Sequence, residues 1–257
     1  MQHRPNRSPL PFPPNPHYGT GATRRRVDLV NDGSKAIARL IDPFHEMDCE
    51  IAHDGQRIMA ITGVMHRYPT TLCPGAHSVL QELVGANIDE TSARLYEAAF
   101  QRRNCTHLLD LAWLAMNHAK RGQGTRVYEA YVPDEHGEPL VMDLHCDDNL
   151  LHRWTVVHGV ATDPPDVAGM PLLKGFWTRA SELFSGDALE AAMILSRTYL
   201  IAVGRAYDTQ AWAGRPVADN VPLRDKCYAY SSQHGEVGRF LGDHVRDLPD
   251  RIKPRAQ

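Results

Sequence analysis

Apolar and polar residues alternate along the first part of the chain, and this period-two pattern predicts β-strands. The alternating runs fall at residues 27–30, 36–41, 47–51 and 58–64. Two turn sequences, Asn31-Asp32-Gly33 and His53-Asp54-Gly55, interrupt them. Short alternating runs with Asp-Gly turns are typical of an antiparallel meander with one buried face. We therefore expect the folded part of the chain to open with such a meander.

The spacing of apolar residues changes after Cys73-Pro74-Gly75, and the new spacing predicts helices. Helices are expected at residues 79–84, 91–101, 104–121 and 188–207. Strands of a second meander are expected at 127–132, 140–146 and 151–157, followed by a Pro/Gly-rich connection at 162–175 and a short strand at 226–230. Because strand runs and helix runs are segregated, the sequence predicts an α+β fold. We expect one domain over 24–257, with antiparallel meander sheets packed against three or four helices.

The N-terminal segment, residues 1–23, differs from the rest in composition. Five of its prolines fall close together, at Pro9, Pro11, Pro13, Pro14 and Pro16. Such a segment forms neither a helix nor a central strand. It is predicted to be an extended arm, and the pattern leaves open whether the arm is loose or packs on a second subunit.

Composition and charge narrow the functional classes. The net charge is −3 with the 14 His taken as neutral, whereas nucleic-acid binding requires a clear basic excess. No apolar run reaches the ~18 residues of a membrane helix, and the first residues lack the apolar core of a signal peptide. The five Cys, an odd number, suit reduced thiols. We expect a cytoplasmic protein that binds neither nucleic acid nor membrane.

One polar cluster lies at the start of the third predicted helix. Asn104 is a good N-cap residue, which would place Cys105 in the first turn, where the helix dipole lowers a thiol pKa. His107 and Asp110 share a helix face, as an oriented general base would require, and His118 lies further along. The same residues also fit a capped helix with a buried thiol and a structural His.

A second polar cluster follows the first meander. Arg67 can clamp a carboxylate or phenolate, and Tyr68 can donate a hydrogen bond or act as an acid. Cys73 comes next and fits either a site residue or a small core residue. His45, just before a strand, is a further candidate, although a lone His is commonly structural.

Metal binding is a separate alternative. A metal reading of the sequence gathers Cys73, Cys105 and His107 with Cys227 or His45. The chain has neither a Cys-x-x-Cys nor a His-Glu-x-x-His motif, so standard zinc spacings are absent. We expect that no metal is needed.

The same segments resemble a known family. They are Phe44-His45-Glu46-Met47, Tyr68-Pro69, Cys73-Pro74 and Cys105-Thr106-His107-Leu108. They resemble the His-Asp-Met, Pro-Tyr-x-x-Cys-Pro and Gly-Cys-Thr-His-Leu elements of a bacterial family known only as a domain of unknown function. A late Cys-His-Ala of that family is matched by Cys227-Tyr228-Ala229, and the resemblance covers roughly residues 24–240.

The chain departs from the family pattern at five positions. Glu46 replaces an Asp, Asn104 a Gly and Asp110 a Glu, while Arg67 precedes Tyr68. Tyr228 replaces the late His, which puts in doubt any metal site that depends on that His.

Some relatives in that family resemble cofactor-independent lyases of aromatic catabolism. These release formaldehyde from hydroxymethyl side chains of lignin-derived phenolic dimers such as phenylcoumarans. The reaction needs a base, a para-phenol as electron sink and a donor to the phenolate or alkoxide. The resemblance implies His107 or His45 as base, Asp110 as its orienting group, and Arg67 and Tyr68 at the phenolate. Substrate contacts would come from Cys73, Cys105, Thr106 and His118 around an apolar pocket.

The expected partners follow from this reading. They are a small aromatic substrate and a second copy of the chain in a homodimer, with no cofactor. Two alternatives stay open: a non-catalytic protein that binds a small aromatic ligand or a metal, and a zinc-assisted hydrolase or lyase.

Overall fold

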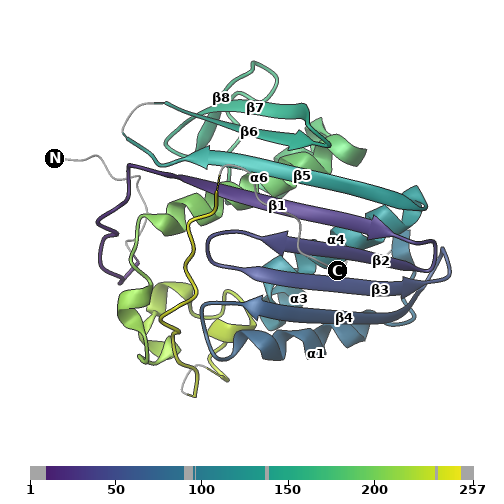
Figure 1. Cartoon of the computed structure of the whole chain (residues 1–257), viewed down its shortest axis with the longest axis horizontal. Helices are drawn as coiled ribbons and strands as arrows, with labels where there is room; N and C mark the ends of the chain where they lie inside the picture. The colour runs from purple at the N-terminus through teal and green to yellow at the C-terminus, as the bar shows by residue number, and fades with distance from the viewer. Residues whose placement is uncertain (1–9, 90–94, 96, 137–138, 235–236, 250–257) are drawn as a thin grey trace. The chain divides into compact units, whose positions relative to one another are not determined.

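A computed structural model of the chain describes residues 10–89, 95, 97–136, 139–234 and 237–249. Eight strands form one sheet in the order β4-β3-β2-β1-β5-β6-β7-β8 (Figure 1). They are β1 (Ala22–Asn31), β2 (Lys35–Ile41), β3 (Glu46–His53), β4 (Ile58–Arg67), β5 (Gly124–Pro133), β6 (Leu140–Cys146), β7 (Asn149–Val157) and β8 (Val160–Asp163). The described α-helices are α1 (His77–Leu80), α3 (Ala98–Arg103), α4 (Thr106–Arg121), α5 (Phe176–Leu183) and α6 (Gly186–Arg205). The predicted α+β class with antiparallel strands is confirmed.

The contacts within the chain divide it into two compact units. The first unit comprises Met1–Arg26, Val127–Asp208 and Asp247–Gln257, and the second comprises Val27–Arg126 and Thr209–Arg246. Each unit has its own buried residues, so each is described separately. The expectation of a single domain over 24–257 stays a prediction.

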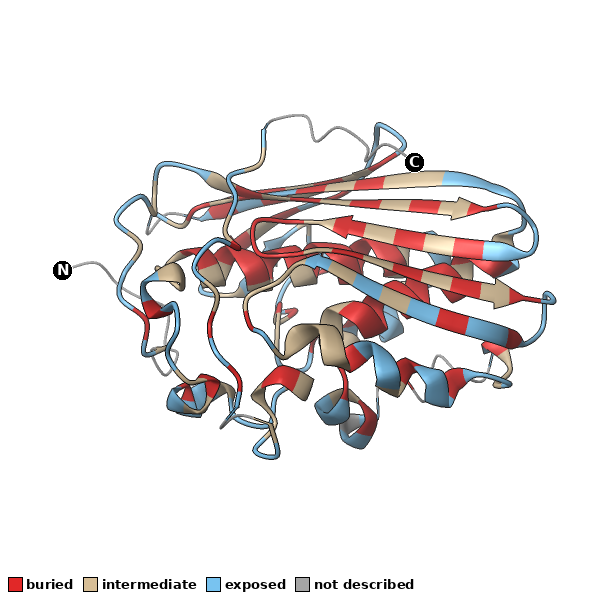
Figure 2. Ribbon diagram, turned by 60° about the horizontal axis from the view of Figure 1, so that its bottom comes forward, coloured by how far each residue is buried: buried red, intermediate tan, exposed pale blue. Residues whose placement is uncertain are grey.

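The second unit is built on the first meander. β2 pairs antiparallel with β3, and β3 with β4, so that Leu40 lies opposite Met47 and Glu46 opposite Arg67. Met47, Cys49 and Ile51 are fully buried on one face of β3, as the alternation predicts. Figure 2 shows buried positions alternating with less buried ones along the strands.

Helix α4 covers β2 and β3 within the second unit. Its apolar stripe is buried: Leu108, Leu111, Ala112, Ala115 and Ala119. Apolar residues at helical spacing give the helix one continuous apolar face, and this face packs on the sheet. The packing also holds the first turn of the helix in position. Gly122, at φ 90°, ends the helix, and the predicted helix end at residue 121 agrees.

The first unit carries the second meander. β6 pairs with β5 and β7, and β8 adds a short strand that the sequence reading did not include. α6 packs on β6 and β7, and its bounds are close to the predicted 188–207. Helix α5 was also missed, because its eight residues follow directly on the Pro/Gly-rich segment.

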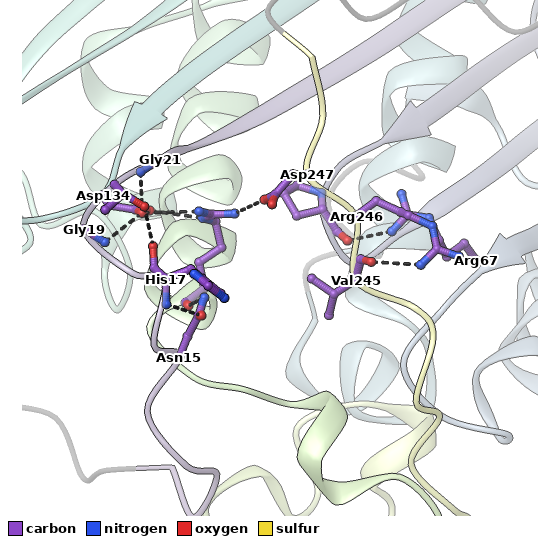
Figure 3. A network of polar contacts seen from close by, with 12 residues as sticks. Asn15, His17, Gly19, Gly21, Arg67, Asp134, Val245, Arg246 and Asp247 are labelled. Carbon is purple, nitrogen blue, oxygen red and sulfur yellow. Dashed lines mark hydrogen bonds and ion pairs between the residues drawn. The ribbon is translucent and has the colours of Figure 1, made fainter.

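The described part of the arm lies against its own unit. The Pro13 carbonyl accepts a hydrogen bond from Asp208 N–H at 2.8 Å, and Asn15 Nδ2 donates to the Arg205 carbonyl at 2.8 Å. Buried Asp134 then accepts the backbone N–H groups of Gly19 and Gly21 (Figure 3). Residues 10–21 are thus tied to the end of α6 and to the loop after β5. Packing on a second subunit stays a prediction.

Two local predictions differ from the structure, and a third lies mostly outside the described residues. Residues 226–230 form no strand; Tyr228–Tyr230 make a 3-10 helix instead. The helix expected at 79–84 is a single α-turn, α1, followed by a 3-10 turn at Gln81–Leu83. Most of the helix expected at 91–101 lies outside the described residues, and α3 begins only at Ala98.

Candidate functional site

The candidate site begins in the turn between β2 and β3. Asp42 N–H donates to the His45 carbonyl at 2.9 Å, which closes the turn. Asp42 Oδ1 accepts the backbone N–H groups of Phe44 at 2.9 Å and His45 at 2.8 Å. An Asp side chain that bonds the backbone two and three residues ahead is the usual way to fix such a turn. The carboxylate is fully buried, so its direction is set by these bonds.

The same carboxylate also contacts a histidine ring. His45 Nδ1 lies 3.1 Å from Asp42 Oδ1, and His45 is 8 % exposed. The Asp42–His45 pair has the arrangement that fixes the tautomer of a general base, because a carboxylate at Nδ1 holds the proton there and leaves Nε2 to accept.

Helix α4 brings a second histidine to this pair. The rings of His45 and His107 have centroids 4.1 Å apart with an interplanar angle of 33°. His107 lies in the first turn of α4, which packs on β2 and β3. Donor atoms of Asp42, His45 and His107 all lie within 4.8 Å of one another. The structure therefore gathers two imidazoles and one carboxylate.

Close packing fixes the first turn of α4. A Cβ added to Gly63 of β4 would lie 2.6 Å from Leu108 Cδ2 and 3.2 Å from Leu108 Cγ. Leu108 is fully buried next to His107 in the sequence. The absence of a side chain at Gly63 thus lets α4 approach the sheet at the point where His107 reaches His45.

Arg67 has a different role from the one predicted. Its Nη1 donates to the carbonyls of Pro43 and His244, each at 2.7 Å, and its Nη2 to those of Asp42 at 2.5 Å and His45 at 3.0 Å. Burial lowers the pKa of Arg67, although Asp42 and Glu46 act in the opposite direction. Arg67 therefore ties the Asp42–His45 turn to the segment around His244, and these bonds occupy the guanidinium that the sequence reading assigned to the phenolate.

Tyr68 lies at the edge of the same region. The antiparallel pairing of Glu46 with Arg67 places Tyr68 next to the turn residue His45 at the end of β4. Tyr68 is half-buried. Its proposed role as hydrogen-bond donor stays a prediction.

The thiol of Cys105 does not have the environment that was predicted. Cys105, rather than Asn104, is the N-cap of α4, and Asn104 Oδ1 accepts the Cys105 N–H at 2.8 Å. Burial raises the pKa of Cys105 and outweighs the backbone N–H groups of Leu108 and His107, which lower it. The free-energy cost of burying the thiolate exceeds its stabilisation by the N-terminus of the helix. The prediction of a low thiol pKa is wrong.

Cys73 has a similar environment. Burial raises the pKa of its thiol to about 12, while a contact with Thr70 Oγ1 at 3.2 Å lowers it. A buried, protonated thiol is a poor nucleophile. Cys73 therefore fits a packing role better than covalent catalysis.

Cys227, in the segment that follows α6, lies close to these two cysteines. Tyr228 N–H donates to the Asn104 carbonyl at 3.0 Å, and a Cβ added to Gly75 would meet the Tyr228 hydroxyl at 2.6 Å. These contacts join the segments that carry Cys73, Cys105 and Cys227. The sequence-based metal reading grouped these thiols correctly in space, but among the described residues only Asp42, His45 and His107 form a group with donor atoms within 4.8 Å.

Three other predicted site residues lie on α4. Thr106 is its first residue and is half-buried, and Asp110 is buried one turn further on. His118 is 11 positions after His107, which is about 16 Å along a helix that rises ~1.5 Å per residue. Its Nε2 contacts the Gly124 carbonyl at 3.1 Å. His118 is therefore not a substrate residue of this site.

Sequence reasoning missed two residues. Asp42 was given no role, although an Asp at the start of a turn is the signal for the side-chain bonds that it makes. His244 is buried beside Phe44, with ring centroids 6.0 Å apart. Burial lowers the pKa of His244 to about 4. Its position 199 residues after His45 left no local signal.

Comparison with known proteins adds one match. Residues 27–121, less than half of the chain, match the model of a family described as a protein of unknown function (DUF2889). The match agrees with the resemblance to a domain of unknown function that the sequence shows, and it assigns no activity. The matched stretch includes Asp42, His45, Arg67 and His107. No curated protein matches the chain, and none of the described helices is long and apolar enough to cross a membrane.

Proposed function

We propose that the chain is a carbon–carbon lyase of aromatic catabolism that releases formaldehyde from the hydroxymethyl side chain of a lignin-derived phenolic dimer. The observation that supports it is the Asp42–His45 pair, 3.1 Å apart, with the His107 ring 4.1 Å from that of His45. The reaction needs a positioned base, and His45, with Asp42 at its Nδ1 and a second imidazole beside it, can act as one.

The proposed reaction balances without an oxidant or a reductant. In a phenylcoumaran, the ionised para-phenol expels the ether oxygen and forms a quinone methide. A base then takes the hydroxyl proton of the hydroxymethyl group, and the carbon–carbon bond between that group and the side chain breaks. The electron pair of this bond forms the central double bond and returns the ring to a phenolate. The base passes its proton to the phenolate oxygen that the ether released, so the products, formaldehyde and a stilbene, have the same total number of atoms as the substrate.

The residues fit these steps in the following roles. His45 Nε2 accepts the hydroxyl proton while Asp42 holds Nδ1–H, so the carboxylate also stabilises the imidazolium that forms. In this proposal His107 donates to the developing oxyanion, and Tyr68 donates to the phenolate. Arg67 acts on the site through the turn, because its four backbone contacts hold both Asp42 and His45.

A second candidate is a zinc-assisted lyase or hydrolase. The observation in its favour is that Asp42, His45 and His107 offer a carboxylate and two imidazoles within 4.8 Å of one another. Bound zinc would polarise a carbonyl or alkoxide oxygen or activate a water. In both candidates the same three side chains carry the chemistry.

The experiment is incubation of the pure protein with free-phenol dimers that bear a hydroxymethyl group. Formaldehyde and the conjugated stilbene are measured in parallel and should appear in equal amounts. The matched control substrate carries a methylated phenol, which blocks the quinone methide and should not react. Absence of formaldehyde from every dimer would remove the lyase proposal, and turnover of the methylated phenol would remove the proposed electron sink.

A further inference from the structure

We propose that Asp42, His45 and His107 form a binding site for one divalent transition-metal ion. The inference concerns binding, so it stands whether or not the chain releases formaldehyde. It also differs from the metal reading of the sequence, which relied on cysteines and left Asp42 out.

The first argument is the separation of the donor atoms. Ligands at ~2.0–2.2 Å from a common ion lie roughly 3 to 4 Å from one another. The donor atoms of the three side chains already lie within 4.8 Å of one another. Binding of an ion would bring the donor atoms that lie furthest apart closer to one another.

The second argument is burial. Asp42 is fully buried and His45 is 8 % exposed, whereas adventitious carboxylate clusters are typically at the surface. Buried charged side chains in proteins commonly coordinate metal ions or pair with other charged groups.

The third argument is the support behind the ligands. Metal sites hold their ligands through outer hydrogen bonds that fix side-chain direction. Asp42 Oδ1 is fixed by the N–H groups of Phe44 and His45, and Arg67 holds the carbonyls on both sides of them. His107 is fixed by the packing of Leu108 against Gly63. Each ligand therefore comes from a backbone segment with its own restraints.

The ligand set determines the class of ion. Two imidazoles and one carboxylate suit Zn²⁺, Fe²⁺, Co²⁺ and related first-row ions, and disfavour Ca²⁺ and Mg²⁺, which prefer oxygen ligands. Three protein ligands leave at least one position for water or substrate, which is typical of a reactive site rather than a structural one.

The test uses Co²⁺ and Zn²⁺ on chelator-treated full-length protein, without substrate. Titration calorimetry should show one ion per chain, and the Co²⁺ complex should show visible d–d absorption without a thiolate charge-transfer band. His45→Ala, His107→Ala and Asp42→Asn should each weaken binding by about 10²-fold or more. The matched control is His66→Ala, because His66 forms a similar pair with Asp48 at 3.2 Å on the surface. It should bind as the unchanged protein does.

Three results would overturn the proposal: no binding at micromolar metal, unchanged binding in the His107→Ala variant, or a charge-transfer band that Cys73→Ser or Cys227→Ser removes. His107→Ala is the deciding variant, because Asp42→Asn also changes the turn; circular dichroism checks the fold of each. Metal binding without formaldehyde release would support the metal site and contradict the lyase proposal. Formaldehyde release by a protein that binds no metal would support the lyase proposal and contradict the metal site.

Discussion

The His45 and His107 rings lie 4.1 Å apart, one from a β-turn and the other from the first turn of a helix that packs on the same strands. Asp42 completes the group from the same turn as His45. The arrangement depends on two structural residues, Arg67 behind the turn and Gly63 beneath the helix. Both can be tested without a substrate.

Replacement of Arg67 by Lys should destabilise the second unit. A Lys ammonium cannot reach four carbonyls arranged around a planar guanidinium, and buried carbonyls that lose their donors cost free energy. We expect the free energy of unfolding to fall by about 2 kcal/mol, measured by urea denaturation. Arg57→Lys is the control, since exposed Arg57 donates to a single carbonyl, that of Gly85. Equal effects in both variants would show that the turn does not depend on Arg67.

Replacement of Gly63 by Ala should push α4 away from the sheet. The new Cβ would lie 2.6 Å from Leu108 Cδ2, and overpacking of this kind costs roughly 1–3 kcal/mol. The double variant Gly63→Ala, Leu108→Ala should lose less stability than the sum of the two single variants, because the clash is then absent. Additive losses in thermal or urea unfolding would contradict this contact.

The thiols of Cys73 and Cys105 should react slowly near neutral pH. Burial raises both pKa values, that of Cys73 to about 12, so little thiolate is present at pH 8. The pKa of the Cys73 thiol in the folded chain lies above its unfolded value of 9.0. The stability that the protonated, buried thiol contributes is therefore complete below pH 9 and is lost as pH rises from 9 towards 12. Alkylation followed by mass spectrometry checks this, with the guanidinium-unfolded chain as control. Fast labelling of either thiol at pH 7 would contradict it.

Acid should weaken the first unit through His152. Burial lowers the pKa of His152 from 6.5 and outweighs the bond to the Ala188 carbonyl at 2.8 Å, which raises it. The unfolded chain then binds a proton before the folded chain does, so the stabilising effect is complete above pH 6.5 and is lost as pH falls below it. Urea unfolding between pH 7.5 and 5 should show a decline that is smaller in His152→Gln. An identical decline in both proteins would assign the effect to other groups.

The sequence predicts much of this fold because burial on one face imposes a period on the residues. Met47, Cys49 and Ile51 reveal β3, and the stripe from Leu108 to Ala119 reveals α4. Boundaries are harder to predict: Asn104 is the favoured N-cap residue type, yet the helix begins one residue later, with Cys105 at the N-cap position. A strand was expected at residues 226–230, yet Tyr228–Tyr230 form a 3-10 helix. Tyr228 N–H donates to the Asn104 carbonyl, a contact that no local pattern shows.

The candidate site was predictable in part. His45, His107 and Tyr68 stood out as residue types, but the group around Asp42 depends on the packing of α4 over the β2–β3 turn. Arg67 was expected at the ligand because guanidinium groups bind anions well, and it is instead bonded to four main-chain oxygens. Whether Arg67 binds an anion or main-chain carbonyls depends on the three-dimensional position of the turn, which the sequence does not show.

Tyr68 should matter for turnover rather than for folding. It is half-buried beside the site, and a phenol that donates to the substrate phenolate acts mainly in the transition state. Tyr68→Phe should lower kcat for the phenolic dimer by roughly 10²-fold if Tyr68 is an acid–base group, with unfolding free energy within about 0.5 kcal/mol of the unchanged protein. Unchanged kcat in this variant would place the phenolate elsewhere.

The central claim is that the Asp42–His45–His107 group performs the chemistry, and the most direct measurement compares formaldehyde release by His45→Ala and His66→Ala on the same phenolic dimer. Both residues are histidines paired with an Asp, at 3.1 Å and 3.2 Å, but only His45 adjoins His107. The account predicts that His66→Ala matches the unchanged protein and that His45→Ala is slower by about 10²-fold or more. Equal rates in the two variants would contradict it.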